Sequence, residues 1–378
     1  MFHERIEKLR ALLEEANLDA ALFYKPINIY YLTGYISLDS SRPTSYMRPI
    51  FAVVDRKSTS LVLPELALEA AKKICWIRDF RTYTRSPAYE EAKKRLVERL
   101  SETPGKTRRF GIDEDYMPVG IVKDLEKLFP EDKLENAASL VQKMRLIKSS
   151  AEISELRKAA KISDIAIAAS IKQVNEKRSE LEAQAYGNFS VFTEHFDESG
   201  VNIDTISIIL GGARSSMPHE FTSERVFKPG EIMWHCWLTS YKGYWAENVR
   251  SGVVGKATAD QRYIAGIVQE ALEIGREEVR PGNQACNLYK KVHSVLKKAN
   301  VDNGLILSRS GHGIGLEYHE PPFIELADNT VFIPGMALTV EPGIFISGYG
   351  GFTLSDTLIV TDKGHEVLTS FPIELFES

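Results

Sequence analysis

The pattern of apolar residues changes once along this 378-residue chain, and the change limits the fold class. Up to about Asn136, helical stretches alternate with short apolar runs, the clearest being RIEKLRALLEEAN, AALFY, IFAVV, TSLVLP, EEAKKRLVERL, RFGID and IVKDLEKLF. Helices that alternate with strands are typical of a layered α/β domain. We therefore predict that residues 1–138 form an α/β domain.

The second pattern begins with a long amphipathic helix, MRLIKSSAEISELRKAAKISDIAIAASI, which Ser149 or Ser150 can cap ahead of Glu152. Several β-type runs follow, with the helical stretches ADQRYIAGIVQEALEIGREEV and ACNLYKKVHSVLKKA between them. An antiparallel sheet covered by helices on one side accounts for this order. We predict that residues 139–378 form an α+β domain that carries the chemistry.

Composition excludes several classes of protein. The chain is 43% hydrophobic and 26% charged with a formal net charge of -5, so no basic field attracts nucleic acid. Its cysteines, Cys75, Cys236 and Cys286, are far apart and form no CxxC motif, which indicates reduced thiols. We find no signal peptide and no apolar run near the roughly 18 residues of a membrane span. The sequence therefore predicts a soluble, cytoplasmic protein with a small polar partner.

Two histidines and a glutamate draw attention in the second domain. His312 lies between glycines in GHGIG, where a backbone without side chains can approach a ligand. His319 precedes Glu-Pro-Pro, and Glu341 ends the β-run ALTV before Pro-Gly, at a strand end where sites often form. Each has a structural alternative, as a hydrogen-bonded histidine in a turn or a solvated turn residue. Together they favour a catalytic or metal site.

These residues carry a family resemblance. In order and rough spacing, the chain resembles the Xaa-Pro dipeptidase, aminopeptidase P and creatinase family through MRLIKSSAEISELRKAA, MPHE, VRPG, GHGIGLEYHEPP, PGMALTVEPGIF and GGFTLSDTLIVTDKGHEVLT. INIYYLTGY resembles the N-terminal domain of that family. The resemblance implies a pita-bread catalytic domain behind a smaller creatinase-type α/β domain. It also implies a homodimer in which the N-terminal domain reaches the partner's active site.

The resemblance further implies a metal centre, from which this sequence departs. Peptidases of the family hold two divalent ions with two Asp, one His and two Glu. The matching positions here are Cys236, Glu247, His312, Glu341 and Ser355. Four carboxylates usually neutralise two dications, whereas this set contains two. We therefore expect no dinuclear site and at most one manganese, cobalt or zinc ion, on Glu247, His312 and Glu341.

This chain also resembles creatinase, a member of the same family that works without metal, and the resemblance implies that a metal-free mechanism is open to it. The catalytic histidine of creatinase matches His219 in SSMPHEF. There a neutral imidazole would take a proton from water or substrate and return it to the leaving nitrogen. His312 and His319 would polarise the reacting carbon, and Glu247 and Glu341 would pair with cationic nitrogen. The guanidinium-binding glutamates of creatinase have no counterparts here, so creatine is not the predicted substrate.

The hairpin CWLTSYKGYWAENVRS raises a question of orientation. Strand alternation favours Cys236 on the side of Glu247 and His235 on the other side, although a slip of one residue would reverse this. Cys236 is then either a thiolate ligand for zinc or a small buried residue. Three tryptophans of this hairpin form either an aromatic box for a cationic ligand or part of the core: Trp234, Trp237 and Trp245.

Two arginines in SSRPTSYMRP, Arg42 and Arg48, are candidates to reach into a partner subunit's pocket and bind a substrate carboxylate. A solvated loop is the competing interpretation. Arg250 and Asp356 match family positions that we interpret as structural.

Three hypotheses follow from these residues. The first is a hydrolase of a C–N bond in a small amide or dipeptide, by default a proline dipeptide, that uses His219, His312, His319 and Glu341. The second is a metal-independent, creatinase-like enzyme acting on another small nitrogen compound. The third is a pseudoenzyme that binds a peptide. Four retained titratable groups favour catalysis.

Overall fold

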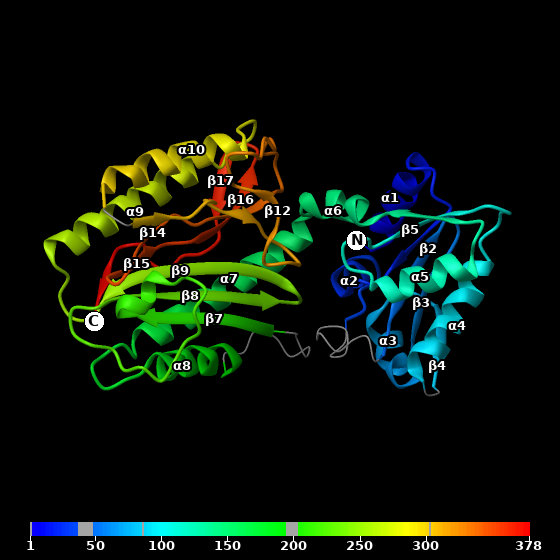
Figure 1. Ribbon diagram of the computed structural model, residues 1–378, viewed down its shortest axis with the longest axis horizontal. Helices are drawn as coiled ribbons and strands as arrows, with labels where there is room; N and C mark the ends of the chain where they lie inside the picture. The colour runs from blue at the N-terminus through cyan, green and yellow to red at the C-terminus, as the bar shows by residue number, and fades with distance from the viewer. Residues whose placement is uncertain (1, 37–47, 85–86, 194–202, 302–303) are drawn as a thin grey trace. The chain divides into compact units, whose positions relative to one another are not determined.

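The computed structural model describes residues 2–36, 48–84, 87–193, 203–301 and 304–378. The chain divides into two compact units, residues 1–145 and 146–378 (Figure 1). The sequence places the division at residues 138 and 139, where α6 (Ala138–Leu146) begins, and the units divide where that helix ends. None of the described helices is long and apolar enough to cross a membrane.

The first unit is built on a six-stranded mixed sheet of order β4-β3-β2-β1-β5-β6. Every residue of β1 is buried, so both faces of the sheet are covered. Helices α4 and α5 pack with strand residues into one hydrophobic core. The strands are β1 (Ala20–Phe23), β2 (Phe51–Asp55), β3 (Thr59–Pro64), β4 (Asp79–Tyr83), β5 (Arg109–Ile112) and β6 (Lys133–Asn136). The helices are α1 (Phe2–Glu15), α2 (Pro26–Thr33), α3 (Leu68–Ile74), α4 (Ala88–Ser101) and α5 (Val119–Leu128). The α/β prediction is confirmed.

The second unit begins with the predicted long helix α7 (Ser150–Ile171), whose N-terminus is closed by a capping box between Ser149 and Glu152. Helices α7 and α8 (Glu180–Thr193) pack on one face of a sheet of order β18-β9-β8-β7. Its strands are β7 (Ile203–Gly211), β8 (Ile232–Tyr241), β9 (Tyr244–Val253) and β18 (Phe376–Glu377).

A second helix pair, α9 (Ala259–Glu278) and α10 (Ala285–Leu296), packs on the remaining strands. These form a sheet of order β12-β11-β13-β16-β17 and a small sheet β10-β14-β15. The strands are β10 (Gly304–Ile306), β11 (His312–Gly313), β12 (Glu320–Phe323), β13 (Ala337–Val340), β14 (Gly343–Ile346), β15 (Gly350–Thr353), β16 (Asp356–Thr361) and β17 (Gly364–Val367).

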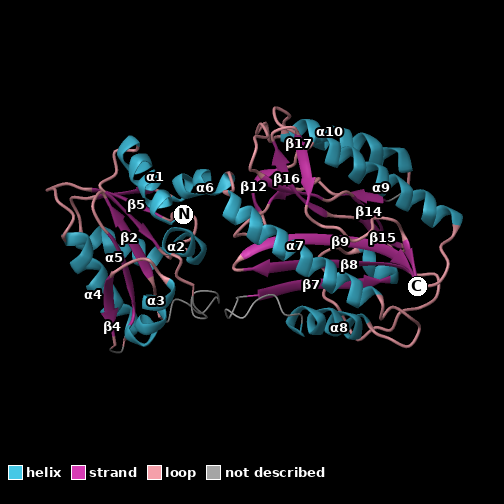
Figure 2. Ribbon diagram, turned by 180° about the vertical axis from the view of Figure 1, so that it is seen from behind, coloured by secondary structure: helices cyan, strands magenta, loops and turns pink. Residues whose placement is uncertain are grey.

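Within this unit the strands lie between the two helix pairs, as both ribbon views show (Figures 1 and 2). The predicted α+β class is confirmed, but the prediction of one sheet with helices on one side is wrong. A sheet with two apolar faces needs a layer on each, and here one face of the β7-β8-β9 sheet packs on helices while the other meets the second group of strands. The bridge between Val249 and Ser355 joins the two groups.

Candidate active site

The hairpin of β8 and β9 fixes the orientation of the first site residues. Its turn, Lys242 and Gly243, has positive φ at both positions (50° and 80°), as a two-residue type I′ turn requires. This turn sets Leu238 opposite Glu247. Because side chains alternate along a strand, Cys236 lies on the same face as Glu247, as predicted. Glu247 is buried, with 3% exposure.

His235 lies on the opposite face of the hairpin and is fully buried. Its Nδ1 is 2.8 Å from the hydroxyl of Ser170 on α7, and burial lowers its pKa to about 3. A neutral imidazole held between sheet and helix is structural. His235 therefore takes no part in the site.

The three tryptophans of the hairpin do not share one box. Trp237 is buried against α7, where its indole N–H donates to the hydroxyl of Ser170. Trp234 is buried on the other face and donates to the carbonyl of Ser215. Trp245 alone of the three meets a ring near the site, since it packs edge-on against Tyr318, with centroids 5.8 Å apart.

The glycines around His312 serve the packing of strands. A Cβ at Gly311 would lie 2.1 Å from the carbonyl oxygen of Thr339, and one at Gly313 would lie 2.3 Å from that of Pro321. Neighbouring backbone, rather than a ligand, therefore excludes side chains here. The backbone N–H of His312 donates to the hydroxyl of Thr339, and its ring Nδ1 lies 3.0 Å from the carbonyl oxygen of Gly313. These two contacts hold the residue in place.

The other ring nitrogen of His312 faces two carboxyl groups. Nε2 lies 3.6 Å from Glu247 and 3.7 Å from Glu341, with no hydrogen-bond partner among the described residues. The ring of His319 meets that of His312 with centroids 4.2 Å apart. Glu247, His312 and His319 offer ligand atoms within 4.8 Å of one another. The structure thus brings together four sequence-predicted residues, which we call the His–Glu cluster: Glu247, His312, His319 and Glu341.

The cluster retains protons at neutral pH. Burial and the charge of Glu247 raise the pKa of Glu341 to about 8. Burial opposes the charged form of His312, but Glu341 and Glu247 raise its pKa to about 9. Burial likewise opposes the charge of Glu247, yet interaction with His312 holds its pKa below the ordinary value. The result is one carboxylate, one carboxylic acid and one imidazolium.

Neutral groups border the cluster. Burial, followed by the charges of Glu247 and Glu341, raises the pKa of the Cys236 thiol well above its ordinary value. The buried hydroxyl of Ser355 has no partner of ordinary hydrogen-bond geometry. Its interaction with the carboxyl group of Glu247 nevertheless lowers the pKa of that group. Burial and the charge of His312 lower the pKa of His319.

His219 is an exposed residue of the second unit, and Arg48 is an exposed residue of the first unit. The charge of His219 is one of the weaker influences that lower the pKa of His319. Arg48 lines a cavity in the first unit with Tyr83 and Leu66. Arg42 lies outside the described residues.

Arg250 and Asp356 form a buried structural network. The guanidinium of Arg250 donates to Asp356 at 2.8 Å and to the carbonyl of Ser355 at 2.7 Å. Arg276 on α9 binds the other carboxylate oxygen of Asp356. The network joins β9, β16 and α9 behind the cluster, as expected for residues with a structural role.

Sequence analysis missed a buried ion pair beneath the cluster. Lys148 Nζ lies 2.7 Å from Glu320 Oε1, and these side chains are 2% and 4% exposed. Both side chains pack against Gly315, where an added Cβ would lie 2.6 Å from Glu320 and 3.1 Å from Lys148. Lys148 and Glu320 are 172 residues apart in sequence, so no local sequence pattern predicts the pair.

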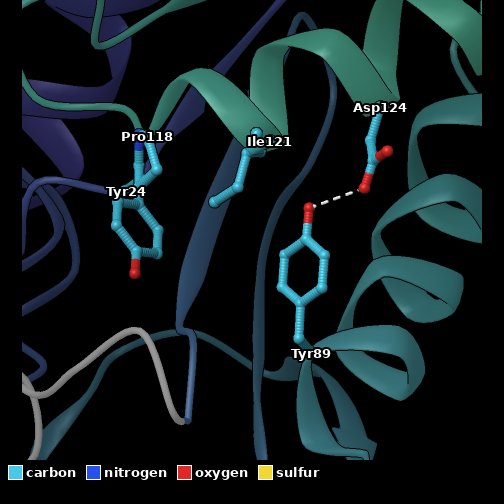
Figure 3. Close-up of a pocket in the computed structure, with 6 residues that line it drawn as sticks. Tyr24, Tyr89, Pro118, Ile121 and Asp124 are labelled. Atoms are coloured by element: carbon cyan, nitrogen blue, oxygen red, sulfur yellow. Dashed lines mark hydrogen bonds between the residues drawn. The ribbon is translucent and has the colours of Figure 1, made fainter.

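A cavity of about 340 Å³ in the first unit is a different kind of site (Figure 3). Its one carboxylate, Asp124, accepts hydrogen bonds from Tyr89 and Lys93. The lining contains neither histidine nor cysteine: Tyr24, Tyr89, Pro118, Gly120, Ile121 and Asp124. It offers no acid–base pair, so the His–Glu cluster is the candidate active site.

The chain resembles known proteins along its whole length. Residues 5–147 match the creatinase/prolidase N-terminal domain, and residues 154–362 match metallopeptidase family M24. The Xaa-Pro dipeptidase of Pyrococcus furiosus is 30% identical over 98% of this chain and 99% of its own length. The Pyrococcus horikoshii prolidase structure has a TM-score of 0.84 at 27% identity, covering 99% of this chain and 100% of that one. The Xaa-Pro dipeptidase structure from Bacillus anthracis has a TM-score of 0.86 at 26% identity, covering 100% of each. A creatinase-type N-terminal domain thus precedes a pita-bread catalytic domain of C–N hydrolases, and the chain belongs to metallopeptidase family M24.

Proposed function

We propose that this chain hydrolyses a C–N bond in a small amide or dipeptide with the imidazole and carboxyl groups of the His–Glu cluster. One observation carries the proposal, namely that His312 Nε2 lies between Glu247 and Glu341 at 3.6 and 3.7 Å while His319 meets its ring. Such a convergence of titratable groups is typical of an active site. Relatives named Xaa-Pro dipeptidase make proline dipeptides the first substrates to test.

The residues do not fit the pair of metal ions that the family implies. Cys236 and Ser355, at two of the five matching positions, bring a thiol and a hydroxyl where the family has carboxylates. The carboxyl groups of Glu247 and Glu341 bring at most two negative charges, against the four positive charges of two dications.

One divalent ion is the most that the cluster accommodates. Glu247 and His312 would hold it, with Glu341 or His319 as the third ligand. Manganese, cobalt or zinc, when bound, polarises a carbonyl and lowers the pKa of a bound water.

The remaining chemistry belongs to side chains. His319 is exposed beside the buried His312, so it is placed to take a proton from water and return it to the leaving nitrogen. His219, whose charge acts on His319, is a second exposed imidazole proposed for this role. Glu247 lies beside His312 and is the ionised carboxylate that pairs with cationic nitrogen of the substrate, whereas Glu341 is the carboxylic acid of the cluster.

Hydrolysis of Xaa-Pro dipeptides tests the proposal. The assays contain manganese, cobalt or zinc in turn, or a chelator, and metal content is measured in protein purified without added metal. We expect turnover with no more than one ion per chain. Turnover that survives chelation and is lost in His219→Ala favours the metal-independent alternative. Absence of turnover on dipeptides and on other small amides contradicts the proposal and favours a peptide-binding pseudoenzyme.

A further inference from the structure

The cavity in the first unit has the size and the lining of a small-molecule binding site. Its volume of about 340 Å³ lies within the usual range of ligand pockets, roughly 300–1,000 Å³. Two tyrosine rings, a proline and an isoleucine form most of the lining. In Figure 3 the side chain of Ile121 points from α5 between the rings of Tyr24 and Tyr89. These walls suit a ligand with an apolar or aromatic body.

Contacts within the first unit fix the two tyrosine rings. Tyr24 is 5% exposed, and its ring packs against that of Phe51 with centroids 5.3 Å apart. The hydroxyl of Tyr89 donates to Asp124 at 2.9 Å, which ties this ring to α5. Fixed walls favour binding, because little side-chain freedom is lost when a ligand enters.

Asp124 is the only charged residue among the described residues that line the cavity. Lys93 and Tyr89 both donate to its Oδ2, at 3.0 and 2.9 Å. The bond from Lys93, followed by that from Tyr89, holds the pKa of this carboxyl group below its usual value, so the group is ionised at neutral pH. Within the described part of the chain, no hydrogen bond engages Oδ1. One carboxylate oxygen is therefore able to accept from a ligand.

The neighbouring lysines do not fully satisfy this carboxylate. The Nζ of Lys93 also binds Glu90 at 2.8 Å, so one ammonium group serves two carboxylates. Lys127 acts on Asp124 through its charge alone and more weakly. An organic cation can donate a charge-assisted hydrogen bond to Oδ1, and the tyrosine rings attract it as well. An anionic ligand would meet a carboxylate with no cationic group in the described lining.

We propose that this cavity binds a small organic amine with an aromatic body, whose ammonium group donates to Asp124 Oδ1 while its ring lies between Tyr24 and Tyr89. The function is binding alone, because the cavity offers no acid–base pair. The site consists of residues of the first unit, so the inference is independent of the proposed hydrolysis.

Three probes with one ring system test the preference for a cation. They are tryptamine, the neutral alcohol tryptophol and the anion indole-3-propionate, and ligand-observed NMR titrations of the full chain give their dissociation constants. For a ligand of about twelve non-hydrogen atoms, we expect a dissociation constant of about a millimolar. One charge-assisted hydrogen bond at a partly exposed carboxylate corresponds to about tenfold in affinity. Tryptamine should therefore bind about tenfold more tightly than tryptophol, and indole-3-propionate should bind most weakly.

A glycine allows the cavity to be filled without damage to the fold. A Cβ at Gly120 would meet no neighbouring heavy atom within 4 Å, so a leucine there extends into open space at the cavity. Gly120→Leu should weaken tryptamine at least about tenfold, and leucine is a better helix former than glycine. Gly266→Leu is the matched control, because Gly266 is a helical glycine of the second unit whose Cβ would likewise meet no neighbour. It should leave every dissociation constant unchanged.

Asp124→Asn tests the carboxylate separately. It should bring the dissociation constants of tryptamine and tryptophol to within about twofold by weakening only tryptamine. Lys93 keeps its bond to Glu90 in this variant, and urea midpoints verify that each variant is folded.

The outcomes decide both the place and the class of the ligand. Tryptamine binding that is weakened by Gly120→Leu, with a preference over tryptophol that is lost in Asp124→Asn, supports the proposal. Binding that Gly120→Leu leaves unchanged places the amine elsewhere, for example at the His–Glu cluster, and overturns it. A wild type that binds no tryptamine, or that binds tryptophol or indole-3-propionate equally well, also overturns it.

Discussion

At the scale of single residues, the cluster assigns different tasks to two neighbouring histidines. His312 is 2% exposed and fixed at its N–H and Nδ1, whereas His319 is exposed. A proton carrier must meet both substrate and water, and the exposed imidazole satisfies this requirement.

His319→Asn should therefore lower kcat by about 10² to 10⁴, the usual contribution of a general acid–base group. The fold should be unaffected, because the ring is at the surface. Steady-state kinetics on the best substrate measures the effect, and circular dichroism monitors the fold. His3→Asn, which changes an exposed histidine of the first unit, should leave kcat unchanged. A His319→Asn enzyme within threefold of the wild type would contradict this role.

Carboxylates placed at positions 236 and 355 should allow a second metal ion to bind. Cys236→Asp with Ser355→Glu raises the number of carboxyl groups near His312 from two to four, enough to neutralise two dications. We expect manganese content after dialysis to rise from at most one ion per chain to two, measured by elemental analysis. The neutral pair Cys236→Asn with Ser355→Gln should produce no rise. A wild-type protein that already holds two ions would refute the charge argument.

At the scale of elements, the ion pair of Lys148 and Glu320 ties the segment before α7 to β12. Glu320 directly follows His319 and lies opposite Gly313 in the β11–β12 pairing. The pair therefore supports the strand that presents His319. A buried pair of this kind is costly to break, since its remaining member is left charged in a region without water.

Lys148→Met should lower the free energy of unfolding by about 3–5 kcal/mol, the range for removing one partner of a buried pair. The double variant Lys148→Met with Glu320→Leu should recover most of the loss, because no charge is then buried. Urea denaturation followed by tryptophan fluorescence measures both. If the double variant is no more stable than the single one, the loss arises from packing instead of charge.

Local signals predict the elements well and their assembly less well. The capping box at Ser149, the strands of the first unit and the orientation of Cys236 follow from patterns within a few residues. The Lys148–Glu320 pair and the two-sided helix packing depend on contacts between distant segments, which periodicity does not encode.

At the scale of the molecule, the two units have separate hydrophobic cores, and the whole His–Glu cluster belongs to the second. The homodimer remains a prediction, as do the roles of Arg42 and Arg48 at a partner's site. Sedimentation velocity tests the dimer directly.

Separate cores predict separate responses to mutation. Phe110→Ala, at a residue 1% exposed in the first unit, should cost about 3–5 kcal/mol. We expect faster hydrogen exchange across residues 2–145 and unchanged exchange across residues 146–378, as measured by mass spectrometry. Phe352→Ala, in a core of the second unit, should give the converse pattern. Equal acceleration in both units after either change would mean that they unfold as one.

The state of the cysteines has a practical consequence. Cys75 and Cys286 are buried, and burial together with the charges of Glu247 and Glu341 raises the pKa of the Cys236 thiol. Thiol-reactive dyes attack thiolates at accessible positions, so all three native sulfurs should resist labelling in the folded protein. One cysteine introduced on the surface of each unit would then accept a fluorophore selectively, and energy transfer between the two dyes would report how the units are arranged in solution.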